Sequence, residues 1–257
     1  MRSVRTVRQR RNSGQILLIA AFIMASLLVS AQIYIVDTGK IMTETDSESL
    51  TDFIQALKLG SRHVTAGSLA NITNGGAIGV LEANLQKWSY VLSRQYLFGK
   101  NVLNYTLYET SPYSSGIWMD WGTNGVGISS AYANFTYRLS DRETQIDQSY
   151  FINITAMVTV ESHYRTLSGD IRQVNVIINL RNEDEPALAR QITVYYRVSG
   201  GWQIPDAVNN YEMTDYGNGT YTASFIVDAP GPTIEVSSHL IDERQILVQA
   251  NVTSTQV

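Results

Sequence analysis

The order of apolar and polar residues divides the chain into three regions, and the first contains a long apolar run. Residues 16–36 carry no charged side chain, and Ser26, Ser30 and Gln32 are the polar members of the run. As a helix, these 21 residues measure about 31 Å, which matches the thickness of a bilayer core. The run therefore predicts a transmembrane helix over residues 15–37.

Helical spacing of apolar residues continues in the second region, residues 38–100. Between positions 40 and 59 the pattern predicts either an outward continuation of the membrane helix or a second helix starting at a capping box over 45–48. Gly60 is expected to end this helix, and residues 65–76 are expected to form a loop. A further helix is predicted over about 77–96, where Ile78, Leu81, Leu85, Trp88 and Leu92 share one face. This stripe indicates core packing.

Alternation of apolar and polar residues with period two takes over from about Val102 onward and predicts β-strands. The clearest runs cover 152–160, 174–180, 192–198, 221–227, 234–240 and 246–252. Glycine- and proline-rich turns separate them. The pattern indicates an antiparallel β-sandwich, with an immunoglobulin-like domain at 168–257. Residues 101–167 are β-rich and form either a separate small sheet packed on the helices or extra strands of the same sandwich. The predicted fold class is therefore α+β.

The turn at residues 215–221 supports this assignment. Its sequence, Asp-Tyr-Gly-Asn-Gly-Thr-Tyr, resembles the D-x-G-x-G-x-Y turn of immunoglobulin-like modules in microbial surface proteins. Gly217 and Gly219 permit the positive φ angles of a hairpin, and Tyr221 is expected to begin the next strand facing the core.

The charge distribution predicts how the chain is oriented in a membrane. The whole chain has a net charge of −4, but residues 1–14 contain five arginines and no acid, leaving 14 basic against 23 acidic residues beyond them. The positive-inside rule places the first 14 residues in the cytoplasm and the C-terminal domain outside the cell. The alternative is a secreted protein cleaved after Ala31, because Val29-Ser30-Ala31 has the small-residue spacing of a signal-peptidase site.

The residue inventory carries no sign of catalysis. The chain has no cysteine, which excludes disulfides, thiolate metal sites and thiol catalysis. Its three histidines form no metal motif, and acidic groups at 141–147 and 183–185 lack the spacing of a calcium loop. We therefore expect no enzyme activity, no cofactor and no metal. Trp118 and Trp121 are candidate binding aromatics with opposite strand phase, so at least one indole is expected in the core.

Six N-x-T triplets are the most informative polar signal. Sixteen asparagines, in a chain with 24 serines and 22 threonines, give about three N-glycosylation triplets by chance. The predicted acceptors are Asn71, Asn104, Asn134, Asn153, Asn218 and Asn251. Strand phase places Asn153 and Asn251 away from the apolar faces of their strands, and Asn218 lies in the predicted turn. N-glycosylation of these sites would require an extracytoplasmic location.

The N-terminal region resembles that of known surface proteins. Many glycan acceptors behind a basic segment and one apolar helix look like an archaeal cell-surface protein. Residues 13–19 (Ser-Gly-Gln-Ile-Leu-Leu-Ile), with Val-Asp-Thr-Gly at 36–39, are similar to the N-termini of TadE/TadG-like pilus-assembly proteins and type IV pilin-like proteins. The resemblance implies a glycine before an apolar helix, sometimes cleaved after Gly14, and an external β-containing domain. Ser13 and Ile19 replace the basic and acidic residues of a prepilin site, which favours a minor or assembly role.

The sequence thus predicts a single-pass, glycosylated protein of the cell envelope, pilin-like or pilus-assembly-like in role. The alternative is an adhesin-like or solute- or glycan-binding ectodomain. Expected partners are membrane lipid and other pilin-like or envelope proteins. No nucleic-acid binding is expected, because the one basic cluster is the arginine segment, which suits contact with anionic lipid.

Overall fold

The computed structural model describes residues 46–95, 100–140 and 145–257. The chain divides into two compact units, Met1–Lys58 and Leu59–Val257. The described part of the first unit is the beginning of a helix, and the architecture below is that of the second unit. Within the described ranges, neither helix combines the length and hydropathy needed to cross a bilayer. The predicted basic segment at 1–14 and membrane helix at 15–37 lie outside these ranges.

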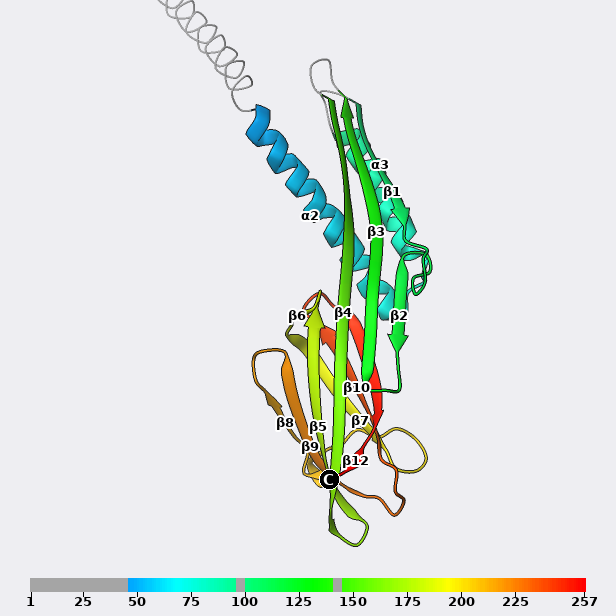
Figure 1. The fold of residues 1–257 in the computed structure, drawn as a ribbon, viewed down its shortest axis with the longest axis vertical. Helices are drawn as coiled ribbons and strands as arrows, with labels where there is room; N and C mark the ends of the chain where they lie inside the picture. Colours follow the sequence, from blue (N-terminus) through cyan, green and yellow to red (C-terminus); the bar gives the residue numbers. More distant parts are fainter. Residues whose placement is uncertain (1–45, 96–99, 141–144) are drawn as a thin grey trace, which may run out of the picture. The chain divides into compact units, whose positions relative to one another are not determined.

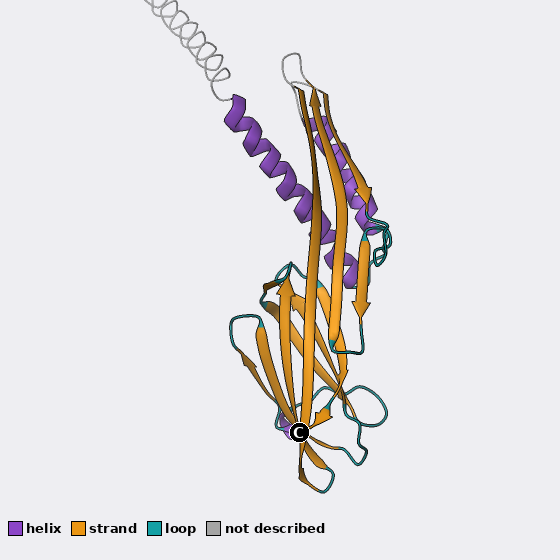
Figure 2. Ribbon diagram, in the orientation of Figure 1, coloured by secondary structure: helices purple, strands orange, loops and turns teal. Residues whose placement is uncertain are grey.

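Two helices precede the strands, and both classes of element are distinguished in Figure 2. The helices are α2 (Asp46–Thr73) and α3 (Val80–Gln95). The first strands are β1 (Lys100–Leu107), β2 (Ile117–Trp121), β3 (Val126–Ser140), β4 (Gln145–Ser168), β5 (Ile171–Asn182) and β6 (Glu185–Pro186). The later elements are β7 (Ala189–Arg197), a 3-10 turn (Ala207–Asn209), β8 (Glu212–Asp215), β9 (Thr220–Asp228), β10 (Glu235–Asp242), β11 (Leu247–Thr253) and β12 (Thr255–Gln256). Antiparallel sheet with two helices makes the described chain α+β.

The strands form one large sheet and one small sheet. The large sheet has the order β1-β3-β4-β5-β9-β8, and β2, β6 and β12 pair with β3, β5 and β4 at its margins. The small sheet has the order β11-β10-β7. Neighbouring strands are antiparallel except β12, which runs parallel to β4.

The long β3–β4 hairpin links the two ends of the large sheet (Figure 1). At one end β3 pairs with β1, on which α3 packs, and at the other end β4 pairs with β5 from Ala156 onward. Residues 101–167 therefore supply strands of the large sheet, and α3 packs on the β1 end of that sheet. The proposed boundary at 168 falls in the hairpin between β4 and β5.

The small sheet packs on the second end of the large sheet, burying the predicted alternating positions. The Tyr196 ring of β7 lies 5.4 Å from the Phe225 ring of β9, centroid to centroid. The fully buried core includes Ile154, Val158, Val174, Ile178, Phe225, Val236, Leu240 and Val248. The period-two pattern thus identified the core-facing side of these strands.

The stripe predicted to lie on a helix at 77–96 is largely confirmed. In α3, Leu81, Leu85 and Leu92 are buried, whereas Ile78 precedes the helix and is 48% exposed. Asn101 of β1 donates a 2.9 Å hydrogen bond to the carbonyl of Leu92, which ties α3 to the sheet. The helix therefore covers the β1 end of the large sheet with the face that the spacing indicated.

The predicted helix end at Gly60 and the predicted loop at 65–76 are wrong, because α2 continues to Thr73. A Cβ at position 60 would lie 2.5 Å from Cζ2 of Trp88. Glycine at this position therefore allows the indole of α3 to lie against the helix backbone. The cost of glycine in a helix interior, about 1 kcal/mol relative to alanine, is offset by this close packing.

Candidate functional site

The open face of the β1–β3–β4 sheet holds three of the six predicted glycan acceptors. On the opposite face, Leu103 and Phe135 are buried at the α3 side. On the open face Asn104 lies opposite Thr136, and Thr106 lies opposite Asn134, so that two N-x-T triplets pair reciprocally across adjacent strands. Asn104 and Asn134 are exposed. Asn153 is the third acceptor and lies on the same face of β4.

Five aromatic rings gather on this open face. We call Tyr108, Tyr113, Trp118, Tyr132 and Phe151 the aromatic cluster. The rings of Tyr132 and Phe151 are stacked, with centroids 5.7 Å apart and an interplanar angle of 7°. Tyr113 contacts Tyr108, Trp118 and Tyr132 edge-on at 5.5–5.9 Å. Phe151 is 63% exposed although one face of its ring is stacked on Tyr132.

A buried serine supports the aromatic cluster from below. Ser130 Oγ lies 2.9 Å from the Tyr113 hydroxyl, 2.8 Å from Thr155 Oγ1 and 3.1 Å from Asn153 Oδ1. Thr155 Oγ1 also donates to Asn153 Oδ1 at 3.3 Å. The carboxamide oxygen and the hydroxyl of the Asn153 triplet are therefore already engaged, and Asn153 itself is half-buried.

The two candidate binding tryptophans lie on opposite faces of β2. Trp118 belongs to the aromatic cluster. Trp121 lies on the other face, where its Nε1 donates a 3.0 Å hydrogen bond to Ser129 Oγ, which in turn donates to the Leu247 carbonyl at 2.7 Å. Trp121 therefore helps to join the two sheets, and the two indoles do not form one site.

The three remaining glycan acceptors have different surroundings. Asn71 is exposed in the last turn of α2, but Thr73 is only 3% exposed and donates to the Ala70 carbonyl. Asn218 is exposed in the β8–β9 turn. Asn251 on β11 is half-buried, and its Oδ1 is a buried acceptor with no hydrogen-bond partner among the described residues.

The β8–β9 turn has the geometry expected from its glycines. Gly217 and Gly219 have φ angles of 70° and 82°. Asp215 Oδ1 accepts a 2.7 Å hydrogen bond from the Gly217 amide, which holds the turn. Tyr221 is buried, and its hydroxyl accepts a 2.8 Å hydrogen bond from the Ala189 amide. Burial raises the pKa of Tyr221, so it stays neutral.

A cavity lined by polar and aromatic side chains lies over the small sheet; we call it the second-sheet pocket. It has a volume of about 350 Å³ and is lined by Tyr195, Trp202, Ser237, His239, Gln249 and Asn251. The Tyr195 and His239 rings are 4.7 Å apart, and His239 Nε2 lies 3.1 Å from Ser237 Oγ. Burial lowers the pKa of His239, so the imidazole is neutral at pH 7. Rings, amides and hydroxyls without a charge suit a neutral polar ligand.

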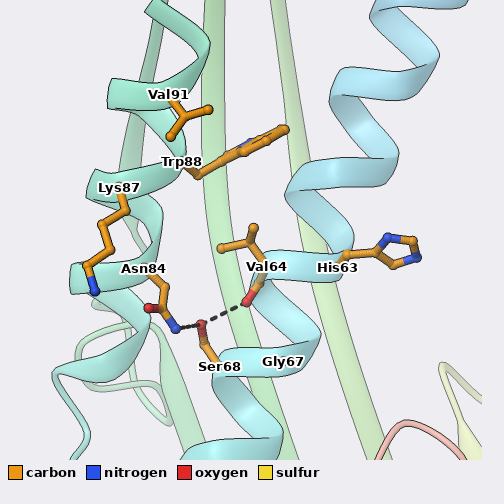
Figure 3. Close-up of a pocket in the computed structure, with 8 residues that line it drawn as sticks. All are labelled: His63, Val64, Gly67, Ser68, Asn84, Lys87, Trp88 and Val91. Atoms are coloured by element: carbon orange, nitrogen blue, oxygen red, sulfur yellow. Dashed lines mark hydrogen bonds between the residues drawn. The ribbon is translucent and has the colours of Figure 1, made fainter.

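A groove of about 320 Å³ lies between α2 and α3 (Figure 3). Asn84 Nδ2 donates to Ser68 Oγ at 3.0 Å, and Ser68 Oγ donates to the Val64 carbonyl at 2.7 Å. The imidazole of His63 points away from α3 in Figure 3. The hydrogen bond between Asn84 and Ser68 thus joins α3 to α2. His63 does not take part in a cluster of reactive side chains in this groove.

Four charged residues form what we call the ion-pair network: Arg62, Glu183, Asp242 and Arg244. Arg244 contacts Asp242 at 2.7 Å and Glu183 at 2.6 Å, and Glu183 also contacts Arg62 at 3.0 Å. The Asp242 side chain is fully buried, and its oxygens also accept from the amides of Arg244 and Ile246. The network joins the β5–β6 and β10–β11 turns to α2. The acidic group at 183–185 thus contributes to packing.

No three His, Asp or Glu side chains of the described ranges lie close enough together to hold a metal ion. His163 Nδ1 lies 2.8 Å from Thr255 Oγ1, and Asp147 pairs with Arg138 at 2.7 Å. Asp141 and Glu143 lie outside the described residues.

Comparison with known proteins adds no assignment. The chain matches no protein-family model and no curated protein. The aromatic cluster, the second-sheet pocket and the ion-pair network were not predicted from the sequence, because each collects residues from distant segments. Prediction of the β3–β4 register would have placed Tyr132 opposite Asn153 and therefore diagonal to Phe151.

Proposed function

We propose that this chain is a single-pass, glycosylated protein of the cell envelope, with residues 1–14 in the cytoplasm and the globular domain outside. Its role in this proposal is that of a pilin-like or pilus-assembly-like surface component without enzyme activity. The proposed partners are membrane lipid and other pilin-like or envelope proteins.

The observation that carries this proposal is the asymmetric charge around the apolar run at 16–36. Five arginines precede the run and no acid lies among them, whereas the residues beyond position 14 have a net charge of −9. Basic residues next to a span favour the cytoplasmic side, and anionic lipid headgroups there attract them. The resemblance of residues 13–19 and 36–39 to pilin-like N-termini adds the envelope role.

The arrangement of the strands supports an immunoglobulin-like assignment of residues 168–257. Strands β5, β9 and β8 lie in one sheet and β7, β10 and β11 in the other, with neighbours antiparallel and the facing side chains buried. The glycine-rich β8–β9 hairpin with its buried Tyr221 agrees with the D-x-G-x-G-x-Y turn of immunoglobulin-like modules. Strand β4 also belongs to this arrangement, so the domain would begin before residue 168.

Fractionation of the native host and mass spectrometry of the mature chain test the proposal. We expect the protein in the membrane fraction, its C-terminal domain digested by external protease, and an N-terminus at the initiator end or at Gln15. An N-terminus at Gln32 in the membrane-free fraction would overturn anchoring in favour of the secreted form. Protein confined to the cytosol would overturn the whole proposal.

The pilin-like role is tested separately on isolated surface filaments. We expect the chain to co-purify with filaments, with residues 16–36 protected from solvent exchange within them. An anchored protein that is absent from every filament preparation, and whose deletion leaves filaments intact in number and length, would overturn this part of the proposal alone.

The second-sheet pocket favours a second candidate function, a solute- or glycan-binding ectodomain. Trp202 is 40% exposed at the pocket, and the Arg197 guanidinium lies 4.8 Å from the centre of its ring. Aromatic faces beside amide and hydroxyl groups suit the alternating apolar and polar surfaces of a sugar. Titration with neutral mono- and oligosaccharides should change Trp202 fluorescence in the wild type and not in Gln249→Ala. Trp118→Phe is the matched control, because Trp118 lies outside this pocket.

A further inference from the structure

Three of the six N-x-T triplets have an aromatic residue two positions before the asparagine. Tyr132 precedes Asn134, Phe151 precedes Asn153, and Tyr216 precedes Asn218, as the sequence shows. Aromatic residues make up 10% of the chain, so fewer than one such coincidence is expected among six triplets. In a strand, residues two apart share one face, which places Tyr132 and Phe151 on the same faces of β3 and β4 as Asn134 and Asn153.

The register brings the two strand rings together around one acceptor. Asn134 lies opposite Phe151, and Tyr132, two residues before Asn134, stacks on Phe151. Side chains directly opposite in an antiparallel pair have Cβ atoms about 5 Å apart, within reach of the first sugar of a glycan. Phe151 nevertheless remains 63% exposed. Asn134 is therefore an exposed acceptor beside an apolar ring that has no protein cover over most of its surface.

The β8–β9 turn also has an exposed aromatic residue close in sequence to an exposed acceptor. Tyr216 is 58% exposed and lies two residues before the exposed Asn218. The Asp215 carboxylate and the left-handed Gly217 hold the turn in a fixed shape. Asn218 Oδ1 accepts a 3.1 Å hydrogen bond from the Thr220 amide, which leaves the carboxamide nitrogen, the atom that carries an N-glycan, free of that contact.

We propose that the Tyr132–Phe151 pair and Tyr216 are platforms on which the first sugars of N-glycans at Asn134 and Asn218 stack. One face of a pyranose ring presents C–H bonds with partial positive charge, which pack on the negative face of an aromatic ring. Stacking covers the exposed apolar surface and orders the glycan. This inference rests on the glycosylation in the proposed function and names the protein surface that holds the sugars.

Asn104 is an internal control for this inference. It is exposed on the same sheet, and its triplet pairs with that of Asn134. The residue two before it is Val102. Among the described strands β1 pairs with β3 alone, where Thr136 lies opposite Asn104. A glycan on Asn104 therefore shares the sheet, the strand geometry and the cellular history of the Asn134 glycan. Among the described residues, however, no aromatic side chain lies opposite Asn104 or two positions before it.

The test uses the full-length glycoprotein purified from its native host, after glycopeptide mass spectrometry has measured occupancy. In proton NMR, the first sugar on Asn134 should show upfield ring-current shifts that the sugar on Asn104 lacks. Phe151→Leu should move the Asn134 sugar resonances toward those of the Asn104 sugar. Tyr216→Leu should do the same at Asn218 and leave the other sugars unchanged.

A double-mutant cycle measures the same contact as stability. Phe151→Leu should lower Tm when Asn134 is glycosylated, and the coupling with Asn134→Gln should be about 2–4 °C for a chain of this size. Phe151→Leu combined with Asn104→Gln should be additive. The cycle separates sugar stacking from the loss of the Tyr132–Phe151 contact, because Phe151→Leu removes that contact equally with and without the Asn134 glycan.

Three results would overturn the inference. Occupied Asn134 with unshifted sugar protons and additive Tm changes would show that the ring does not hold the glycan. An unmodified Asn134 in protein recovered from the membrane fraction would remove the occupant while leaving the proposed anchoring intact. Phe151 covered by another protein in the native assembly, detected by crosslinking at position 151, would assign the ring to a protein partner.

Discussion

Arg244 neutralises a carboxylate that has no access to solvent, and its replacement should be costly. The Asp242 side chain is fully buried, and Arg244, 22% exposed, is its one cationic partner among the described residues. Arg244→Met keeps the apolar stem and removes the charge. Removing one partner of a buried pair costs about 3–5 kcal/mol, and we expect the lower end because three amide groups still donate to Asp242. For a unit of this size, about 3 kcal/mol lowers Tm by roughly 6–12 °C.

Thermal unfolding followed by tryptophan fluorescence and circular dichroism measures this loss. Arg138→Met is the matched control, because Arg138 and Asp147 are 65% and 52% exposed and such a pair contributes about 0.2–1 kcal/mol. The double variant Arg244→Met with Asp242→Asn should lose less stability than the two single variants lose together, because the double variant has no unpaired buried charge. An Arg244→Met cost no larger than that of Arg138→Met would refute the reasoning.

Three further outcomes follow from individual positions. Gly60→Ala should destabilise the fold by about 1–3 kcal/mol because the new Cβ meets Trp88. Gly67 has open space around it, so Gly67→Ala should stabilise the fold by up to about 1 kcal/mol. Chemical denaturation of the two variants measures both effects. Burial lowers the pKa of His239, so the stabilising contribution of the neutral imidazole is complete above pH 6.5 and is lost as pH falls through the folded-state pKa. When Tm is measured against pH, this dependence should disappear in His239→Gln. Asn153, whose carboxamide oxygen accepts two hydrogen bonds, should carry less glycan than the exposed acceptors, and equal occupancy by glycopeptide mass spectrometry would contradict this.

The strands and α3 could be predicted because their burial follows a local period. Residues such as Val174 and Ile178 alternate with polar neighbours, and a strand with that pattern has one face to bury. The same reasoning failed at Gly60, where glycine at the predicted helix end instead makes room for Trp88, 28 positions later in the sequence. Local pattern cannot distinguish a glycine that ends a helix from one that admits a neighbour.

The candidate sites required the tertiary structure for the same reason. Phe151 and Tyr132 are 19 positions apart and meet because β3 and β4 pair in one particular register, and a shift by one residue would place the rings on opposite faces. The glycan acceptors themselves were visible in the sequence. Which of them are exposed, and which have a ring beside them, depends on that register.

By itself, the sequence determined the strand and helix periods, the glycan-acceptor triplets and the uneven charge around residues 16–36. These properties depend on neighbours within a few positions, so they can be identified without knowledge of the fold. The tertiary structure decided that the β3–β4 hairpin runs through both ends of the large sheet and that Asp242, Arg244 and Glu183 meet. It also gathered the five rings of the aromatic cluster on one face. Such contacts join segments far apart in the chain, and only the packing of one buried face against another selects them.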